Sequence, residues 1–342
     1  MKKTNVFYLL SLLLAVSCAT EPTAHSGSDR RPSWMENPSI KYPAKYYITA
    51  VGEGDTLSDS QNAAAANLAK VFRSDIHVEE NLQERYFEMI GKKNSYQEST
   101  KFNRKVQLNS KISLFNIKYD RSFTDKTGRV YTLAYLNRHK TAAIYVTRLK
   151  ENNARIVDFI EQSKSKAPSV RYAALAAAMA VSSGSQVLLE QLDIISPAAK
   201  QAINMTYTHD AIAKMYADAA TEIRFSINIK NDVQHKLTDS LESLLTDMGF
   251  AVKPDGALKV GGNISFEDTD LHRGNLSFVR YEVQLEVKDV AGRTVVSLVK
   301  RGREGHVSKK EARARCMRSI VAVVDHDFRD RLQAYFDGLI KR

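Results

Sequence analysis

Cysteine is almost absent from this 342-residue chain, which contains only Cys18 and Cys316. A domain stabilised by disulfides needs an even set of cysteines spread along its length. With one cysteine near the start and one near the end, no disulfide framework is possible. Cys316 falls on the apolar stripe of a predicted helix, a position typical of a buried core thiol rather than of a nucleophile.

The residue clusters that perform catalysis or bind metals are missing as well. The eight histidines form no His-Glu-x-x-His motif and no cysteine–histidine set at zinc spacing, and the chain has no Gly-x-Ser-x-Gly elbow. Asp325-His326-Asp327 is the densest candidate, but adjacent helical residues point in different directions. The adjacent carboxylates Glu79 and Glu80, on a predicted strand, would point to opposite faces. We therefore predict no catalytic residue, no metal ligand and no cofactor.

A nucleotide site is also not expected. Gly52-Glu53-Gly54 separates a predicted strand from a predicted helix, where backbone amides can hold phosphate. However, no Gly-Lys-Ser/Thr follows, the third glycine of a dinucleotide fingerprint is missing, and Glu53 and Asp55 would repel an anion.

Long hydrophobic runs are lacking, and the run at the start of the chain is short. Val6 to Ala15 covers about ten residues, whereas a membrane-spanning helix needs about twenty. Lys2 and Lys3 precede this run, and small residues lead to Cys18 after it. This order of features is that of a cleaved secretory signal.

The stretch Leu14-Ala15-Val16-Ser17-Cys18 resembles the bacterial lipoprotein signal. The resemblance implies that residues 1–17 are removed and that Cys18 becomes the acylated first residue. Ala19, which is not aspartate, implies sorting to the outer membrane, facing the periplasm. The alternative is an ordinary signal peptide that happens to contain a cysteine. Residues 18–31 are small and polar and would form a flexible tether of about 20 Å.

Acidic residues are outnumbered by basic ones, 39 against 50, and the formal charge of +11 falls to +9 when Lys2 and Lys3 are removed. Export argues against a nucleic acid partner. A membrane with anionic lipids, an acidic cell-wall polymer or acidic envelope proteins remain as partners. A solvated basic face with no special partner is the plain alternative.

After the tether, residues 32–150 predict a first α+β module. Trp34, the only tryptophan, is expected in the core. The expected order is a strand at 46–51, a helix at 58–72, strands at 76–86 and 106–119 with a bulge near residue 115, a turn at 125–128, a strand at 130–136 and a helix through Ile160. Ala63 to Ala66 would let the first helix lie close to a sheet.

Three motifs of this module are similar to the Lpp-twenty family of bacterial envelope lipoproteins. They are Pro32-Ser33-Trp34, the Ala50-to-Gly54 turn into an alanine-rich helix, and Tyr131 to Arg138 before a long helix. The resemblance covers about residues 32–150 and implies a fold and an envelope location, but no activity.

Residues 151–221 predict a helical connector. A helix would start at Pro168 and stop at Ser182-Ser183-Gly184-Ser185, leaving an apolar run too short to span a membrane, and Ser196-Pro197 would start the next helix. Residues 222–342 then predict a second α+β module. Its expected elements are a strand at 223–229, an amphipathic helix closed by Gly249, and strands at 258–266, 279–287 and 294–299, of which 279–287 alternates strictly between apolar and polar residues. The capping box Ser308-Lys309-Lys310-Glu311 then predicts the start of a closing helix.

The predicted fold class is α+β, with two modules of the order strand, helix, antiparallel strands, helix, and a helical connector between them. The similar order suggests an internal repeat. The second module also resembles the small domains of lipoproteins that activate cell-wall synthases or build secretion channels. We expect a non-enzymatic, lipid-anchored envelope protein that acts by binding or scaffolding, with a possible homo-oligomer. The alternatives are an accessory lipoprotein of a synthase, motility or secretion machine, and an envelope hydrolase.

Overall fold

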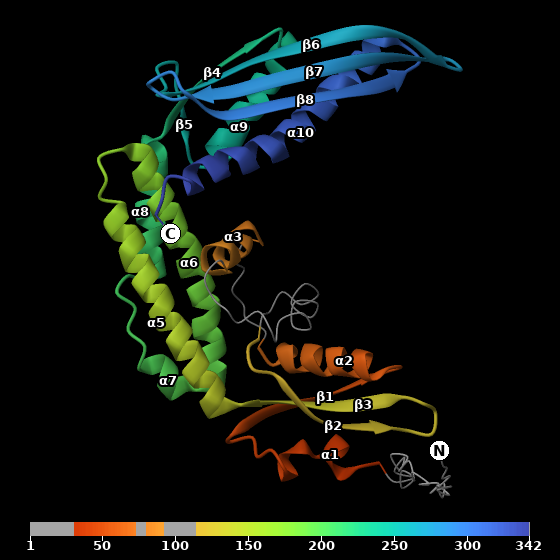
Figure 1. Ribbon diagram of the computed structural model, residues 1–342, viewed down its shortest axis with the longest axis vertical. Coiled ribbons are helices and arrows are strands. Elements are labelled where there is room, and N and C mark those ends of the chain that lie inside the picture. Colours follow the sequence, from red (N-terminus) through yellow and green to blue (C-terminus); the bar gives the residue numbers. More distant parts are fainter. Residues whose placement is uncertain (1–30, 73–79, 92–113, 342) are drawn as a thin grey trace, which may run out of the picture.

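The computed structural model describes residues 31–72, 80–91 and 114–341. The molecule has the shape of a letter C (Figure 1), in which a helical arm joins a three-stranded sheet at one end to a five-stranded sheet at the other. The predicted α+β fold class is confirmed. The elements of the first half are α1 (Ser33–Glu36), η1 (Pro38–Ile40), β1 (Tyr47–Gly54), α2 (Leu57–Lys70), α3 (Glu80–Gly91), β2 (Lys118–Thr124), β3 (Val130–Asn137) and α5 (Arg138–Gln162).

The second half continues the arm and then forms the larger sheet. Its elements are α6 (Pro168–Ile195), α7 (Pro197–Gln201), α8 (His209–Glu222), β4 (Arg224–Lys230), η3 (Val233–His235), α9 (Lys236–Asp247), β5 (Ala251–Val252), β6 (Leu258–Arg273), β7 (Leu276–Lys288), β8 (Thr294–His306) and α10 (Lys309–Asp337).

The first sheet has the order β1-β3-β2, and both strand pairs are antiparallel. Helix α2 lies so close to it that a Cβ on Gly52 would come 1.9 Å from the Ala64 backbone nitrogen. The alanine run of α2 permits this approach, as expected. The glycines were predicted to break the strand, and that prediction is wrong: β1 continues through Gly54, because Gly52 and Gly54 provide room for the helix rather than a turn.

The opposite face of this sheet is closed by aromatic side chains. Trp34 is buried, as predicted, and packs with Tyr42 and Leu133. The Tyr42 ring stacks on Tyr135 at 4.6 Å and meets Tyr47 edge-on at 5.0 Å. Strand β3 is therefore covered on both faces, which explains why residues 130–136 are apolar without alternation.

The prediction of a strand at 76–86 is wrong for residues 80–86, because residues 80–91 form helix α3. Tyr86 and Met89 are buried and lie three residues apart, which is a helical spacing. Residues 76–79 and most of the strand predicted at 106–119 lie outside the described residues. The bulge predicted near residue 115 is not there, because residues 114–117 precede β2 and are not strand; the register shift lies between Tyr119 and Ser122. The turn at Asp125 to Gly128 is confirmed.

The arm consists mainly of α5 and α6. Helix α5 runs continuously through residues 150 and 151, where the sequence suggested a module boundary. Helix α6 begins at Pro168, as predicted, but does not stop at the serines. Ser183 and Ser185 donate hydrogen bonds to the Met179 and Val181 carbonyls four residues back, so their hydroxyls are satisfied within the helix.

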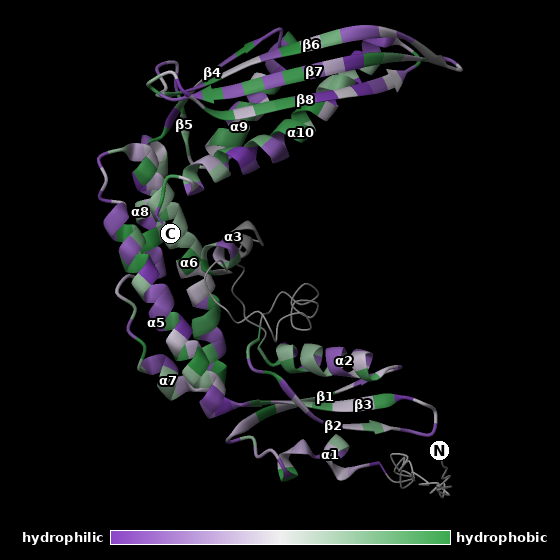
Figure 2. Ribbon diagram, viewed as in Figure 1, coloured by the Kyte–Doolittle hydropathy of each residue, from purple (hydrophilic) through white to green (hydrophobic). Residues whose placement is uncertain are grey.

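The apolar helix is consequently longer than the sequence suggested. By length and composition α6 could cross a membrane, yet 78% of its most apolar 18-residue window is buried inside the protein. Figure 2 shows it as a largely hydrophobic helix between α5, α8 and α3. Gly184 faces the ring of Tyr86, where a Cβ would come within 2.4 Å. The described contacts are those of a core helix.

Helix α3 also links the arm to the last helix of the chain. Arg85 donates to the Asp337 carboxylate of α10 at 2.7 Å, and both side chains are nearly buried, 13% and 9% exposed. Tyr86 accepts a hydrogen bond from Asn152 of α5 at 3.3 Å. Helix α3 thus connects α5 to α10, although these three elements lie far apart in the sequence.

The second sheet has the order β5-β4-β6-β7-β8. Strand β4 is parallel to β5 and β6, whereas β6, β7 and β8 are antiparallel. Helices α9 and α10 cover one face, and Figure 2 shows hydrophobic and hydrophilic residues alternating along the long strands. Strands β6 and β8 extend well beyond residues 266 and 299, where the sequence predicted their ends.

The two sheets differ in topology, although their elements follow a similar order. β1 pairs antiparallel with β3, whereas β4, the first strand of the second module, pairs parallel with β6. Among the described residues after α2, the first module has two strands where three were predicted, because residues 80–91 form α3. The suggested internal repeat is therefore not a repeat of strand pairing.

Candidate functional site

Cys18, the predicted lipid attachment residue, lies outside the described residues. Of the other residues considered from the sequence, the structure places the glycine segment, the Asp325-His326-Asp327 cluster and Cys316. None of these becomes part of a common site.

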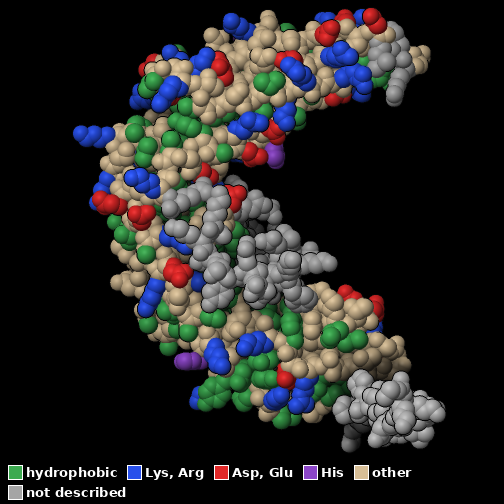
Figure 3. Space-filling view, in the orientation of Figure 1, with side chains coloured by type: hydrophobic (Ala, Val, Ile, Leu, Met, Phe, Trp, Pro, Cys, Tyr) green, Lys and Arg blue, Asp and Glu red, His purple; other side chains and the backbone are tan. Residues whose placement is uncertain are grey.

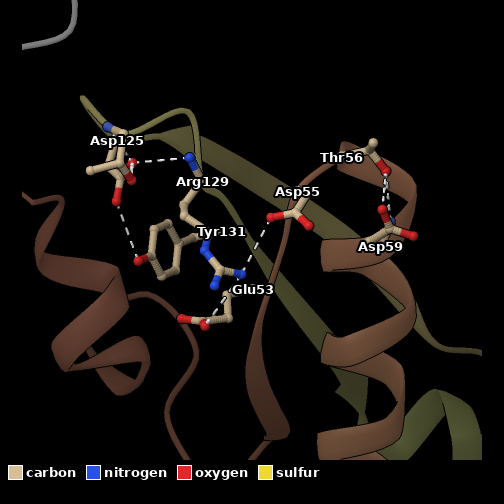
Figure 4. A network of polar contacts seen from close by, with 8 residues as sticks. Glu53, Asp55, Thr56, Asp59, Asp125, Arg129 and Tyr131 are labelled. Atoms are coloured by element: carbon tan, nitrogen blue, oxygen red, sulfur yellow. Dashed lines mark hydrogen bonds and ion pairs between the residues drawn. The ribbon is translucent and has the colours of Figure 1, made fainter.

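The segment around Gly52 to Asp59 forms a polar network that does not resemble a phosphate cradle (Figure 4). Arg129, the residue directly before β3, reaches the carboxylates of Glu53 and Asp55, at 3.8 and 3.5 Å. Thr56 caps α2 by accepting from the Asp59 backbone N–H at 3.1 Å. Glu53 and Asp55 thus bring two carboxylates to the start of α2, and both face Arg129.

Asp125 organises the neighbouring hairpin turn in the same view. Its carboxylate accepts from the backbone N–H groups of Thr127 and Arg129 and from the Thr127 hydroxyl. The hydroxyl of Thr127, followed by the backbone amides, holds the pKa of Asp125 below its usual value. The role of this network is to fix the turn.

The acidic cluster on α10 lies on a solvated face. His326 is well exposed and contacts Asp327 at 3.3 Å and Asp330 at 3.4 Å, while Asp327 also pairs with Lys300. In residues 31–72, 80–91 and 114–341, no three His, Cys, Asp or Glu side chains are grouped so that they could hold a metal ion. Cys316 is completely buried, as predicted, and its thiol donates to the Val279 carbonyl at 3.4 Å.

One serine–histidine contact was not anticipated from the sequence. Ser182 Oγ lies 3.0 Å from Nδ1 of His209, which is the first residue of α8. A nucleophilic triad also needs an acid that orients the histidine. Within the described part of the chain, no carboxylate is bonded to His209, and Ser182 is a buried residue inside a continuous helix. The contact joins α6 to α8.

The feature with the character of a binding surface is the uncovered face of the five-stranded sheet, which we call the open face. Along β7, residues at alternate positions are buried against the helices, and the residues between them point to the open face. Register places Glu282 opposite Arg301 and Gln284 opposite Val299 on this surface. The open face is therefore a broad surface built from side chains of four strands.

A shallow hollow of about 950 Å³ occupies the β4 side of the open face. Amide and hydroxyl groups line it together with four lysines and two glutamates, and Gly261 leaves a gap on its floor. The polar lining residues are Ser226, Asn228, Lys230, Glu242, Lys253, Lys259, Asn263, Gln284, Glu286, Lys288 and Ser297. We call this depression the lysine hollow.

The charges of the open face are unevenly balanced. Glu282 pairs with Arg301 at 2.6 Å and Glu286 with Lys288 at 2.6 Å, and these hydrogen-bonded cations hold the pKa of each glutamate below its usual value. Lys230, Lys253 and Lys259 have no ion-pair partner among the described residues. Glu242, which extends from α9, is likewise without an ion-pair partner among these residues, so four lysines against two glutamates leave the lysine hollow an excess of two positive charges beside amides that can both donate and accept.

The edges of both sheets are partly protected by side chains of the covering helices. On the edge strand β8, the carbonyls of Ser297 and Gly305 accept from Arg331 and Arg315 of α10, at 2.8 and 3.2 Å. On β1, the Val51 carbonyl accepts from Asn67 of α2 at 2.9 Å. Occupied edge carbonyls are poor templates for a further strand, so the open face offers the larger binding surface.

Comparison with known proteins gives little further guidance. No protein-family model matches the chain, and no curated protein matches its sequence. Among solved structures, the chain is similar to a minor lipoprotein from Acinetobacter baumannii, at 12% identity over 33% of this chain and 93% of that one, with a TM-score of 0.26. It is also similar to a secreted protein from Helicobacter pylori, at 13% identity over 83% of this chain and 99% of that one, with a TM-score of 0.41.

Both TM-scores are below 0.5, a level of likeness at which neither fold nor activity carries over to this chain. Membership of the Lpp-twenty family therefore stays a prediction from the sequence motifs. The description of the site depends on the residues themselves.

The sequence contained one clear signal for the open face, the strict alternation between Val279 and Val287. It predicted a half-solvated strand, but it could not show which other strands share that face. The pairing of Asn228 on β4 with Gly261 on β6 places residues 33 positions apart in one hollow. Parallel pairing of this kind has no local sequence signature.

Proposed function

We propose that this protein is a non-enzymatic, lipid-anchored component of the bacterial envelope that binds an anionic envelope polymer through the lysine hollow. The observation that carries the proposal is the excess positive charge from Lys230, Lys253 and Lys259 along the sheet face that none of the described helices covers. Acyl chains on Cys18 would anchor the chain to the membrane, and acyl anchoring gains about 0.8 kcal/mol per buried methylene.

The composition of the hollow favours a carboxylate-bearing glycan of the cell wall over a small molecule. A small-molecule pocket is enclosed and mostly apolar, whereas this hollow is shallow and lined by amides, hydroxyls and lysines. Amides and hydroxyls can exchange hydrogen bonds with sugar hydroxyls, and the lysines can pair with carboxylates. An extended polymer matches its breadth.

The test is co-sedimentation of the full-length protein with purified, protein-free cell-wall sacculi. The Lys230→Glu/Lys259→Glu variant should bind at least tenfold more weakly, because each charge reversal turns an attraction into a repulsion. Raising the salt concentration should weaken binding of the wild-type protein. The matched control, Lys214→Glu/Lys236→Glu, reverses two exposed lysines elsewhere and should bind like the wild type.

Equal binding of both double variants would contradict the role of the lysine hollow, and an absence of sedimentation would contradict the choice of polymer. The anchor is tested separately. Labelled fatty acid should enter the wild-type protein and not Cys18→Ala, and equal labelling of both would refute the lipoprotein assignment. An accessory role at a synthase, motility or secretion machine remains the alternative within the same binding class.

A further inference from the structure

The end of the molecule opposite the five-stranded sheet carries a second hollow of different chemistry. It has a volume of about 630 Å³ and lies where the loop before β1, the start of α5 and the start of α7 meet. Its lining is mostly apolar, and none of its residues is acidic. The residues are Ala44, Lys45, Tyr46, Asn137, Arg138, His139, Ala142, Ala143, Val146, Ile195, Ser196, Pro197, Ala198 and Ala199. We call it the corner hollow.

The side chain of Arg138 builds this corner. It donates to the Ala44 carbonyl at 3.0 Å and to the Ile194 and Ile195 carbonyls at 2.5 and 3.1 Å, and its backbone N–H donates to Tyr46. The guanidinium therefore connects the loop before β1 to the end of α6. The corner hollow is a fixed surface rather than a chance arrangement of two loops.

Apolar and basic side chains are exposed side by side on this surface. Tyr46 is 54% exposed and Ile40, on the same stretch of chain, is 71% exposed. Lys45, which lines the hollow, lies 5.3 Å from the Tyr46 ring centre and has no ion-pair partner among the described residues. Lys41, in contrast, is neutralised by Asp120 at 2.8 Å. Figure 3 shows hydrophobic side chains bordered by Lys and Arg at this end of the molecule.

We propose that the corner hollow docks on the surface of a phospholipid bilayer that contains anionic headgroups. Tyrosine and lysine together are typical of protein surfaces at the membrane interface, where the ring enters the headgroup region and the ammonium meets phosphate. The proposal deepens the proposed function, because acyl chains on Cys18 would bring this end of the chain to the bilayer.

The chain outside the described residues supports this occupant. Arg31 is the first described residue and comes two positions before α1, which lies at the same end of the molecule as the three-stranded sheet (Figure 1). Cys18 precedes Arg31 by thirteen residues, and thirteen residues can reach at most about 45 Å. An acylated Cys18 would therefore hold the corner hollow within reach of headgroups.

Docking would also orient the molecule. Helix α6, with 28 residues, is about 42 Å long and leads from this corner toward the second sheet. A bilayer-bound corner would hold the lysine hollow on the order of 40 Å away from the headgroups, on the side of the cell wall.

The test uses an environment-sensitive NBD fluorophore on the full-length protein in vesicles. Cys316 is completely buried and Cys18 would be acylated, so a cysteine introduced by Ala44→Cys would be the accessible thiol. With phosphatidylglycerol-containing vesicles, NBD at this position should shift to shorter wavelength. NBD at the control position Val290→Cys, in the exposed β7–β8 turn, should not shift.

Charge variants then measure the contribution of the corner. Lys45→Ala should weaken docking about fivefold, because a lysine near an anionic surface contributes about 1 kcal/mol. Lys236→Ala, on α9 beside the other sheet, should leave docking unchanged. Circular dichroism should show unchanged folding of each variant, since both lysines are exposed.

The outcomes separate this proposal from the anchor. Protein that floats with vesicles but shows the same NBD emission at positions 44 and 290 would overturn docking and keep the anchor. Protein that does not float would refute the anchor, and added vesicles rich in phosphatidylglycerol would then test docking directly. A shift at position 44 that needs high protein concentration and no vesicles would overturn docking in favour of a second copy of the chain.

Discussion

The two sheets differ in how many of their faces are covered by other elements. The three-stranded sheet is closed on both sides, by α2 on one face and by the aromatic cluster around Trp34 on the other. Within the described parts of the chain, the five-stranded sheet is covered on one face only, by α9 and α10. Its free face is polar, and buried and outward-facing residues alternate strictly along the central part of β7. The closed sheet is therefore a structural base, and the open sheet offers surface for binding.

The same difference is visible in the glycines. Gly52 lies beneath α2 with no room for a side chain, whereas a Cβ on Gly261 would meet only Glu286, at 3.8 Å. On the closed sheet, glycine allows a helix to approach the backbone. On the open face, glycine leaves a gap at the floor of the lysine hollow.

The largest expected effect is at the junction between the arm and the second module. In Arg85→Ala, the nearly buried Asp337 carboxylate loses the guanidinium that pairs with it. This loss should lower the free energy of unfolding, measured by urea denaturation, by about 3–5 kcal/mol. The double variant Arg85→Met/Asp337→Leu should recover most of this loss. A single variant that is as stable as the wild type would show that the pair does not hold the junction.

The next effect compares the two glycines directly. Gly52→Ala should lower the stability of the first module by about 1–3 kcal/mol, because the new Cβ collides with the α2 backbone. Gly261→Ala should instead stabilise the second module by about 0.5 kcal/mol, since alanine restricts the unfolded chain. Trp34 fluorescence reports the first module and far-ultraviolet circular dichroism the whole chain. Equal changes for both variants would contradict the contrast between the sheets.

A chemical probe distinguishes the covered face from the open face of the second sheet. Cys316 is completely buried, and burial raises the pKa of its thiol, so it should react with a thiol reagent only as the protein unfolds. A thiol placed on the open face by Ser297→Cys should react at once. Rapid labelling of Cys316 in the native protein would contradict the packing of α10 on the sheet.

The smallest expected effect is on acid stability. Arg301 and Lys288 lower the pKa values of Glu282 and Glu286 on the open face. A carboxylate with a lowered native pKa contributes stability above its unfolded pKa, near 4.3, and this contribution is lost as the pH falls through the native pKa. Both groups are solvent-screened, so the loss should be modest. Glu282→Gln should show a flatter stability profile below about pH 4.5, and an unchanged profile would contradict the pairing.

Most of the second module was predictable from the sequence, and the first was less so. Alternation between Val279 and Val287 indicated a half-solvated strand, and Ser308 with Glu311 indicated the start of α10, where Ser308 caps the helix as expected. Both signals are local. The ends of β6 and β8 were missed because their polar distal residues alternate less clearly.

The errors arose where tertiary contacts override local patterns. Residues 80–86 alternate like a strand, but the burial of Tyr86 and Met89 against the arm selects a helix. The serines of α6 were interpreted as the end of the helix. In the structure, Ser183 and Ser185 donate hydrogen bonds to backbone carbonyls of α6, and Gly184 packs against the Tyr86 ring in the core. The two hollows could not be predicted, because each brings together residues from segments that are distant in the sequence.

The central claim, that the open face binds an envelope partner, is tested most directly by photo-crosslinking in living cells. A photoreactive amino acid at Val299, which is 50% exposed and lines the lysine hollow, is compared with one at Val233, which is 66% exposed outside it. We predict adducts with cell-wall material from position 299 and not from position 233. Equal adducts from both positions, or adducts from position 233 alone, would contradict the claim.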